Sequence, residues 1–267
     1  MSFFSDTKFN IKAYRLYRRL KDRSLSIRPN RRCLVPINLE LIAKRYNTVI
    51  VHAGLRAISA RSSSEAFLKI IDSLTNVQTL CIPAFTPSFR KSGVFSVQFS
   101  RPEVGSLSTQ AWLSRPSRTL DPIHSLFVMN GRLDFDCTLD DTFHPSGIFK
   151  NFAQESSCII NIGTPYFVST NLHYVERVAN VPYVKQQLHK GVVLLDGQEP
   201  FHVNHNSYIF NFPIAWNRNK IESFLIRNNA ITVGLWNSAF CRVVNCKKAS
   251  DLLINKLESD PYFMVSF

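Results

Sequence analysis

The chain has 267 residues, which suits one large domain or two small ones. Hydrophobic residues make up 45% of it and charged residues 19%, and this balance excludes a disordered protein. The net charge is +13, from 32 Lys and Arg against 19 Asp and Glu. No apolar run is long enough for a membrane-spanning helix, and no apolar segment follows the N-terminal charges as in a secretory signal. We therefore expect a cytoplasmic protein.

Most of the positive charge lies in the first 34 residues, where ten basic side chains face two acidic ones. Ala13, Leu16, Tyr17 and Leu20 have helical spacing, which predicts an amphipathic helix. That helix either packs its apolar stripe on the protein, which we favour, or contacts an anionic surface. We expect a basic N-terminal extension (1–34), one domain (35–267) and no nucleic-acid partner, because no binding signature accompanies the charge.

An α/β pattern begins after the extension. Residues 35–46 contain a short helix candidate, and residues 48–53 are a β-branched, apolar run that predicts a buried strand. A helix over 65–74 and a strand over 79–83 follow, and strand, helix and strand together predict a parallel βαβ unit. Residues 86–104 are irregular.

The pattern continues to the C-terminus. We predict a helix over 105–113, strands over 125–129 and 157–162, and a helix over 171–180. Residues 192–195 and 208–210 indicate a further β-region with Gly197 in its turn, before a strand over 230–235 and a helix over 249–257.

The most informative local pattern is Thr170, His173 and Glu176, spaced three residues apart. On a helix these positions share one face. The helix would follow a buried strand and a glycine turn, and ligands of open α/β sheets bind beyond the carboxyl ends of strands. A histidine beside a carboxylate is a candidate general base, although spacing alone favours an exposed helix face.

Two further segments contain groups that catalysis uses. Asp121, His124 and Ser125 lie within five residues, where they either orient a substrate or satisfy a turn. Residues 51–56 run from a strand into Gly54, and their backbone N–H groups either bind a carbonyl or phosphate or end an ordinary strand. The glycine motifs of dinucleotide and P-loop sites are absent, as is the serine elbow of hydrolases.

The six cysteines form no Cys-x-x-Cys pair, and no histidine pair has zinc-finger spacing. We therefore expect no metal site, and we expect reduced core thiols without a catalytic role.

Six segments, in order between residues 49 and 183, resemble the antibiotic N-acetyltransferase family, the aminoglycoside 3-N-acetyltransferases and their relatives. Val51-His52-Ala53-Gly54-Leu55-Arg56 is similar to the family's V-H-x-S-L-[RK], with Gly54 in place of serine. Thr170-x-x-His173-Tyr174-x-Glu176 is similar to T-x-L-H-x-A-E. The other segments are Pro83-Ala84-Phe85-Thr86, Gly105-Ser106-Leu107, Arg118 to Ser125 and Ser146-Gly147. The resemblance implies a three-layer α/β sandwich, in which helices flank a central mixed sheet, and not a GNAT fold.

The resemblance also implies an enzyme that acylates an amine with acyl-coenzyme A. His173 would take the amine's proton, oriented by Glu176 or Thr170. Asp121, which stands where the family usually has histidine, would be a further catalytic residue. The residues implied to bind the coenzyme are His52, Ala53, Gly54, Leu55, Arg56, Ser125, Ser146 and Gly147. Those implied to bind the acceptor are Phe85, Thr86, His124 and Tyr174.

Charge distinguishes among the acceptors. Drug-modifying members of the family carry a long acidic insertion that suits polycationic aminoglycosides, whereas this chain is basic overall. We therefore expect a nucleotide-linked amino sugar, acylated with an acetyl or 3-hydroxybutyryl group for a surface polysaccharide such as O-antigen or capsule. The alternatives are aminoglycoside acetylation and a non-catalytic protein that binds a polyanion or a membrane.

Overall fold

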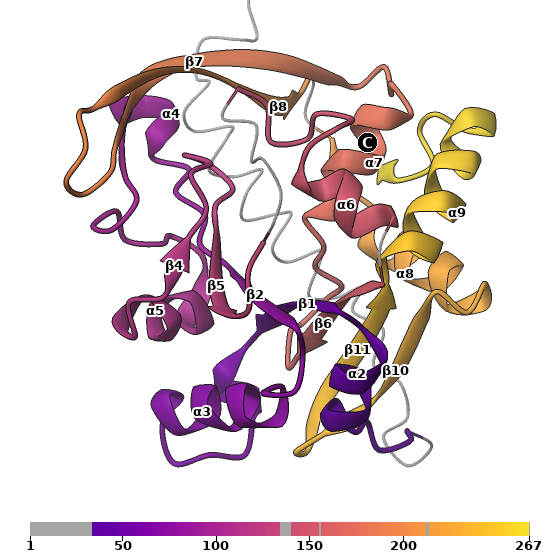
Figure 1. Cartoon of the computed structure of the whole chain (residues 1–267). Coiled ribbons are helices and arrows are strands. Elements are labelled where there is room, and N and C mark those ends of the chain that lie inside the picture. The colour runs from indigo at the N-terminus through magenta and orange to yellow at the C-terminus, as the bar shows by residue number, and fades with distance from the viewer. Residues whose placement is uncertain (1–33, 134–139, 155, 212–213, 267) are drawn as a thin grey trace, which may run out of the picture.

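The computed structural model describes residues 34–133, 140–154, 156–211 and 214–266 (Figure 1). The basic extension up to residue 33 lies outside the described residues, and so does the helix predicted within it. Cys33 and Cys137 also lie outside them.

The centre of the molecule is a seven-stranded mixed sheet with the order β10-β11-β6-β1-β2-β5-β4. The buried strands β1 (Thr48–Ala53), β2 (Thr79–Pro83) and β6 (Ser157–Ile162) run parallel, and this confirms the predicted βαβ unit. The outer strands β5 (Leu126–Asn130), β4 (Ser117–Arg118), β11 (Ala239–Asn245) and β10 (Ile231–Trp236) pair antiparallel.

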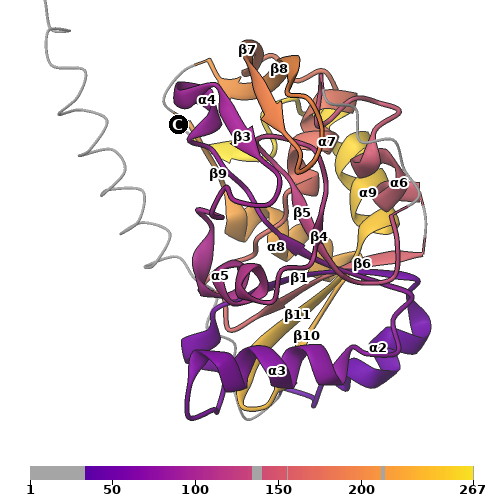
Figure 2. The same ribbon diagram turned by 60° about the vertical axis from the view of Figure 1, so that its left-hand side comes forward.

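Helices cover both faces of this sheet, as Figure 2 shows. Alternate residues of a strand point to opposite faces, so Val49 and Val51 pack with α2 (Leu39–Arg45), α3 (Ser63–Ser73) and α5 (Gly105–Leu113). Ile50 instead packs with α6 (Ile148–Gln154), α7 (Asn171–Val178), α8 (Arg218–Arg227) and α9 (Cys246–Ser259). The predicted three-layer sandwich is confirmed.

A long β-hairpin lies beside the α7 layer (Figure 1). Strands β7 (Val184–Leu194) and β8 (Phe201–Phe210) pair antiparallel along their length, and β3 (Val94–Ser96) adds to the edge of β7. Gly197 lies in the connecting turn with a φ of +70°, as the prediction required. The two short apolar runs predicted here are only the apolar parts of much longer strands.

Several elements were not predicted from the sequence. They are β11, α6, α8, the one-turn helices α4 (Phe89–Ser92) and η2 (Leu55–Ala57), and the short strands β3, β4, β9 (Ala215–Trp216) and β12 (Val265–Ser266). In the part of the chain that the structure describes, no helix is both long enough and apolar enough to span a bilayer.

Candidate active site

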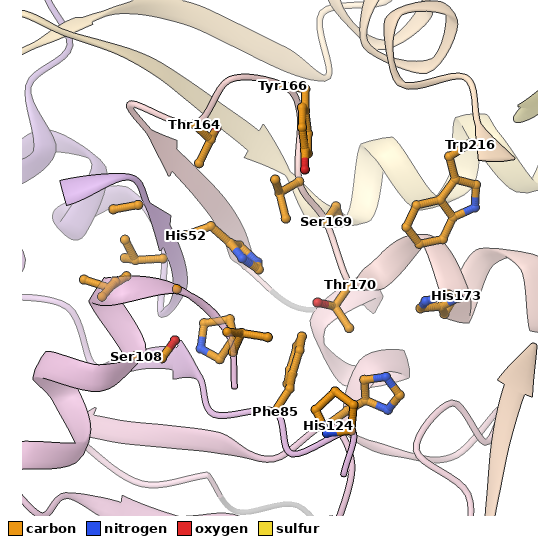
Figure 3. A pocket seen from close by; sticks show the side chains of 18 of the residues that line it. His52, Phe85, Ser108, His124, Thr164, Tyr166, Ser169, Thr170, His173 and Trp216 are labelled. Carbon is orange, nitrogen blue, oxygen red and sulfur yellow. The ribbon is translucent and has the colours of Figure 1, made fainter. Parts of the chain in front are cut away.

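A cavity of about 590 Å³ opens beyond the carboxyl ends of β1 and β2, beside the loop that follows β6 (Figure 3). The starts of α5 and α7 and the strand β9 complete its walls. This is the position at which open α/β sheets bind ligands. The polar side chains that line it are His52, Arg90, Ser108, His124, Thr164, Tyr166, Ser169, Thr170, His173, Trp216 and Arg218.

A hydrogen-bonded chain of three side chains holds His173 on the cavity wall. The His173 Nδ1 lies 3.1 Å from the Glu176 Oε2, and Trp216 donates its Nε1–H to the Glu176 Oε1 over 2.6 Å. The Glu176 side chain is only 1% exposed. Because a carboxylate can only accept, the neutral imidazole carries its proton on Nδ1 and leaves the Nε2 lone pair free to take another.

The loop between β6 and α7 is fixed by a buried amide. Asn161, at the end of β6, accepts from the Val168 N–H over 2.6 Å and donates to the Val168 carbonyl over 2.9 Å. Thr170 then begins α7, and its side chain makes no capping bond to the helix. Its hydroxyl therefore lies at the cavity next to His173, on the helix face that the spacing predicted.

A second histidine, His124, lines the same cavity from the turn before β5. Asp121 shapes this turn by accepting the N–H groups of Ile123 (2.8 Å) and His124 (2.6 Å) and the hydroxyl of Thr142. Asp121 is buried and does not line the cavity. Its carboxylate therefore acts on the turn, a position that does not fit the direct catalytic role predicted for it.

The ionisable side chains among the described residues that line the cavity are arginines, histidines and one tyrosine, not carboxylates. Burial, and secondarily Arg218, lower the pKa of His52 to about 4, so His52 is neutral at physiological pH. Arg218 donates to the Phe167 carbonyl over 2.7 Å, and its guanidinium lies over Tyr166. Arg90 lines the wall near His124. No Asp or Glu is among the described residues that line the cavity.

A second cavity, of about 500 Å³, adjoins the first and is lined by residues 54–57, Ser106 and Gly163. Residues 53, 105 and 164 are adjacent in the chain to residues 54, 106 and 163, and they line the first cavity. The two cavities therefore lie along the same three turns. The turns approach closely here, because a Cβ on Gly54 would lie 2.7 Å from the Gly163 carbonyl oxygen. The serine of the family motif would therefore not fit this arrangement.

The structure places some predicted site residues together and others apart. The main cavity is lined by His52, Ala53, Phe85, His124, Thr170 and His173, and the adjoining one by Gly54, Leu55 and Arg56. Glu176 lies directly behind His173.

Other predicted residues lie outside both cavities. Ser125 is fully buried and bonds to Arg118 and the Ala84 carbonyl, which does not fit coenzyme binding. The Thr86 hydroxyl donates to the Pro122 carbonyl, and Tyr174 packs in the core, so neither fits acceptor binding. Ser146 bonds to His144 at the surface and Gly147 is buried beside it, and neither lines a described cavity.

Several cavity residues were missed by the sequence interpretation. Trp216, Arg218, Tyr166 and Arg90 come from short or irregular segments that carry no recognisable motif. The only signal that could have indicated Trp216 and Arg218 is the aromatic and basic pair around the cap of α8.

The four described cysteines, Cys81, Cys158, Cys241 and Cys246, are buried, which confirms the prediction that these positions lie in the core. Burial raises the pKa of Cys241 and of Cys246 to about 12, so neither is a thiolate at neutral pH. No group of three or more metal-ligating side chains that could hold an ion occurs among the described residues.

Comparison with known proteins identifies relatives of this chain. A family model described as aminoglycoside 3-N-acetyltransferase matches residues 50–258. No curated protein sequence matches the chain.

Three solved structures illustrate the likeness. Aminoglycoside acetyltransferase AAC(3)-Xa is 17% identical, with a TM-score of 0.64 over 90% of this chain and 98% of its own. AAC-IIIb in a binary complex with CoASH is 15% identical, with a TM-score of 0.65 over 84% and 97%. A variant of AAC(3)-IVa in complex with apramycin is 17% identical, with a TM-score of 0.59 over 81% and 86%. At these identities the likeness shows a shared fold.

Proposed function

Because the chain belongs to the aminoglycoside 3-N-acetyltransferase family, whose enzymes are acyl-CoA-dependent transferases, we propose that it moves an acetyl group from acetyl-coenzyme A to an amino group of a sugar. The observation that carries this proposal is the imidazole of His173, which lines the cavity with its Nδ1 held by the buried Glu176.

The chemistry needs a base at this point. The acceptor amine is protonated near neutral pH and must lose a proton before it attacks the thioester carbonyl. The Nε2 of His173 takes that proton, and the adjacent Glu176 carboxylate stabilises the imidazolium that forms. The new C–N bond forms as the C–S bond breaks, and coenzyme A leaves as a thiolate that takes up the proton lost by the attacking nitrogen.

The tetrahedral intermediate also needs hydrogen-bond donors for its oxyanion. The Gly54 N–H cannot serve, because it already donates to the Ile162 carbonyl over 2.9 Å. The Thr170 hydroxyl, beside His173 and free of a capping bond, supports a role for Thr170 as one of these donors.

The two adjoining cavities suit a long co-substrate. A coenzyme that enters along Gly54 to Ala57 would pass between the turns at Ala53 and Gly105 and present its thioester to His173. Arg56 and Ser106 border the outer cavity and could contact the coenzyme's phosphates. Since acyl-coenzyme A is made inside the cell, this proposal places the reaction in the cytoplasm.

The comparisons favour an aminoglycoside as the acceptor. The related AAC(3)-IVa structure is described as a complex with apramycin, and the family carries the name of this activity. On this basis the alternative assignment, aminoglycoside acetylation, is better supported than the nucleotide-linked amino sugar.

One observation keeps the anionic acceptor as a second candidate. Arg90 and Arg218 line the cavity, and none of its described lining residues is acidic. A polycationic drug would therefore enter a positive cavity, whereas the phosphates of a nucleotide-linked amino sugar would be attracted to it.

An acceptor panel tests both. Purified protein is incubated with acetyl-coenzyme A and, separately, apramycin, gentamicin, kanamycin and UDP-linked amino sugars, and products are detected by mass spectrometry. At saturating coenzyme, the KM of an anionic acceptor should rise with salt and that of a polycation should fall, because salt screens exposed charges within about 8–10 Å. No acetylated product from any amine would contradict the proposed function.

A further inference from the structure

Besides His173, the cavity is lined by His124, an imidazole whose protonation is fixed by the protein. The His124 ring lies 6.1 Å from the His173 ring, centroid to centroid, and both line the same cavity (Figure 3). The Phe143 ring packs against both imidazoles, with centroid distances of 5.0 Å to His124 and 5.2 Å to His173. His124 and His173 therefore lie side by side on one wall of the cavity, and both pack against the apolar ring of Phe143.

Thr142 determines which nitrogen of His124 carries the proton. The Thr142 hydroxyl donates to the Asp121 Oδ2 over 2.5 Å, since a carboxylate can only accept. Its single proton is thereby used, and the Thr142 oxygen presents only lone pairs to the His124 Nδ1, 3.3 Å away. The His124 Nδ1 must therefore be protonated, and Nε2 is the nitrogen left to meet a ligand as an acceptor.

A third histidine supports this arrangement from the hairpin. His205, on β8, is fully buried, and its Nε2 lies 3.2 Å from the Thr142 oxygen and 3.8 Å from the Asp121 Oδ1. As a donor it uses the second lone pair of the hydroxyl, which again leaves the Thr142 proton for Asp121.

The surroundings keep His124 neutral. Burial lowers the pKa of His124 well below the ordinary value, and the positive charge of Arg90 nearby lowers it further. A protonated ring would have donors on both nitrogens, so neutrality is what preserves Nε2 as an acceptor.

We propose that Thr142 is a positioning residue that fixes His124 as a second hydrogen-bond acceptor in the cavity, and that this acceptor binds a hydroxyl or amino donor next to the amine that reacts. This inference rests on the proposed function. It specifies the acceptor as an amine with a neighbouring hydrogen-bond donor, as in a vicinal amino alcohol. His173 takes the proton of the reacting amine, and the His124 Nε2 accepts a hydrogen bond from the neighbouring donor.

Substrate discrimination provides the first test. The probes are D-glucosamine, whose amine is flanked by hydroxyls, and cyclohexylamine, which has none. We expect the ratio of their kcat/KM values to fall about 5- to 100-fold in His124→Ala and in Thr142→Val, the range for an unpaired hydrogen-bonding group. Thr142→Ser, which keeps the hydroxyl, should retain the wild-type ratio. The KM for acetyl-coenzyme A should be the same in all three variants.

A double-mutant cycle separates positioning from general damage. If Thr142 acts through His124, Thr142→Val should reduce the ratio no further in a His124→Ala background. Equal losses in both backgrounds, or a Thr142→Val enzyme that discriminates like the wild type, would overturn the proposal.

A measurement that needs no turnover distinguishes failure of this inference from failure of the proposed function. In ¹⁵N spectra of histidine-labelled full-length protein, His124 should show a protonated Nδ1 and an unprotonated Nε2 from pH 6 to 8. Thr142→Val should shift the proton towards Nε2, while Thr142→Ser should not. A His124 that carries its proton on Nε2 in the wild type would contradict the inference whatever the protein acetylates.

Discussion

Two of the three histidines that line the cavity, His173 and His124, are held in different ways. On α7, His173 contacts the Glu176 carboxylate directly, and that carboxylate is buried. On the turn before β5, the imidazole of His124 is linked to the Asp121 carboxylate through the hydroxyl of Thr142. A direct carboxylate stabilises a positive ring, whereas an intervening hydroxyl fixes the tautomer of a neutral one.

This difference assigns different tasks to the two imidazoles. In the proposed reaction His173 gains a proton, so a charge-stabilising partner would lower the barrier. His124 keeps its charge state and presents a lone pair. Under the two proposals, His173 serves as a base and His124 as a recognition group, and the Thr142 hydroxyl between His124 and Asp121 accounts for the difference.

The largest expected effect comes from removing the base. His173→Ala should lower kcat by roughly 10²–10⁴-fold, the usual contribution of a general base, with little change in the KM for acetyl-coenzyme A. Steady-state thiol release at saturating coenzyme measures it. His202→Ala, at an exposed position on β8, is the matched control and should behave as the wild type. A folded His173→Ala enzyme with near-normal turnover would remove His173 from the mechanism.

Glu176→Gln should make His173 resemble His124, because neither ring would then contact a carboxylate directly. The amide oxygen can still accept from the His173 Nδ1–H, but the amide carries no negative charge and its NH2 group then faces the Trp216 N–H. Since hydrogen bonds to charged groups are worth about 1.5–3 kcal/mol, we expect kcat to fall roughly 10- to 100-fold. Circular dichroism and the KM for acetyl-coenzyme A should remain unchanged, and an unaltered kcat would show that the charge of Glu176 does not matter.

Loss of the third member of the chain should have a smaller effect. Trp216→Phe keeps an aromatic ring against His173 but removes the N–H that holds the Glu176 Oε1. We expect a roughly 3- to 10-fold lower kcat and about 1–3 kcal/mol lower stability, because a buried acceptor loses its donor. Initial rates measure kcat, and urea unfolding measures stability. Trp112→Phe, on α5, controls for the loss of a tryptophan at another position.

The smallest expected effect is on stability against pH. The folded pKa of His52, about 4, and the lowered pKa of His124 both lie below the usual unfolded value of about 6.5. The unfolded chain therefore binds more protons below pH 6.5, and stability should fall as the pH falls from 7.5 to 5. For His52 the loss should be at most about 2 kcal/mol by pH 5. Urea unfolding of wild type and His52→Gln checks this, since the variant should show a weaker dependence.

The buried core of the fold could be predicted because its signals are local. The apolar, β-branched runs of β1 and β6 and the one-sided apolar spacing of α3 and α7 are visible in short windows. The hairpin could not be delimited, because mostly exposed and mostly polar residues occupy β7 from Lys185 to Lys190. Its length is set by pairing with β8, which no single window reveals.

The same distinction holds within the site. The three-residue spacing of His173 and Glu176 predicted their contact, since helical geometry brings such positions together. Trp216, forty residues beyond Glu176, and Thr142, eighteen beyond His124, reach their partners only through tertiary packing. Ser125 matched a motif but proved to be a core hydroxyl, because adjacency in sequence does not fix the direction of a strand side chain.

The central claim, direct transfer to an amine assisted by His173, is tested most directly by a single-turnover experiment with radiolabelled acetyl-coenzyme A. Thiol release and N-acetyl product should appear at the same rate, no label should remain on the protein, and His173→Ala should slow both signals equally without weakening coenzyme binding. A burst of thiol that precedes the product, together with acetylated protein, would contradict the account.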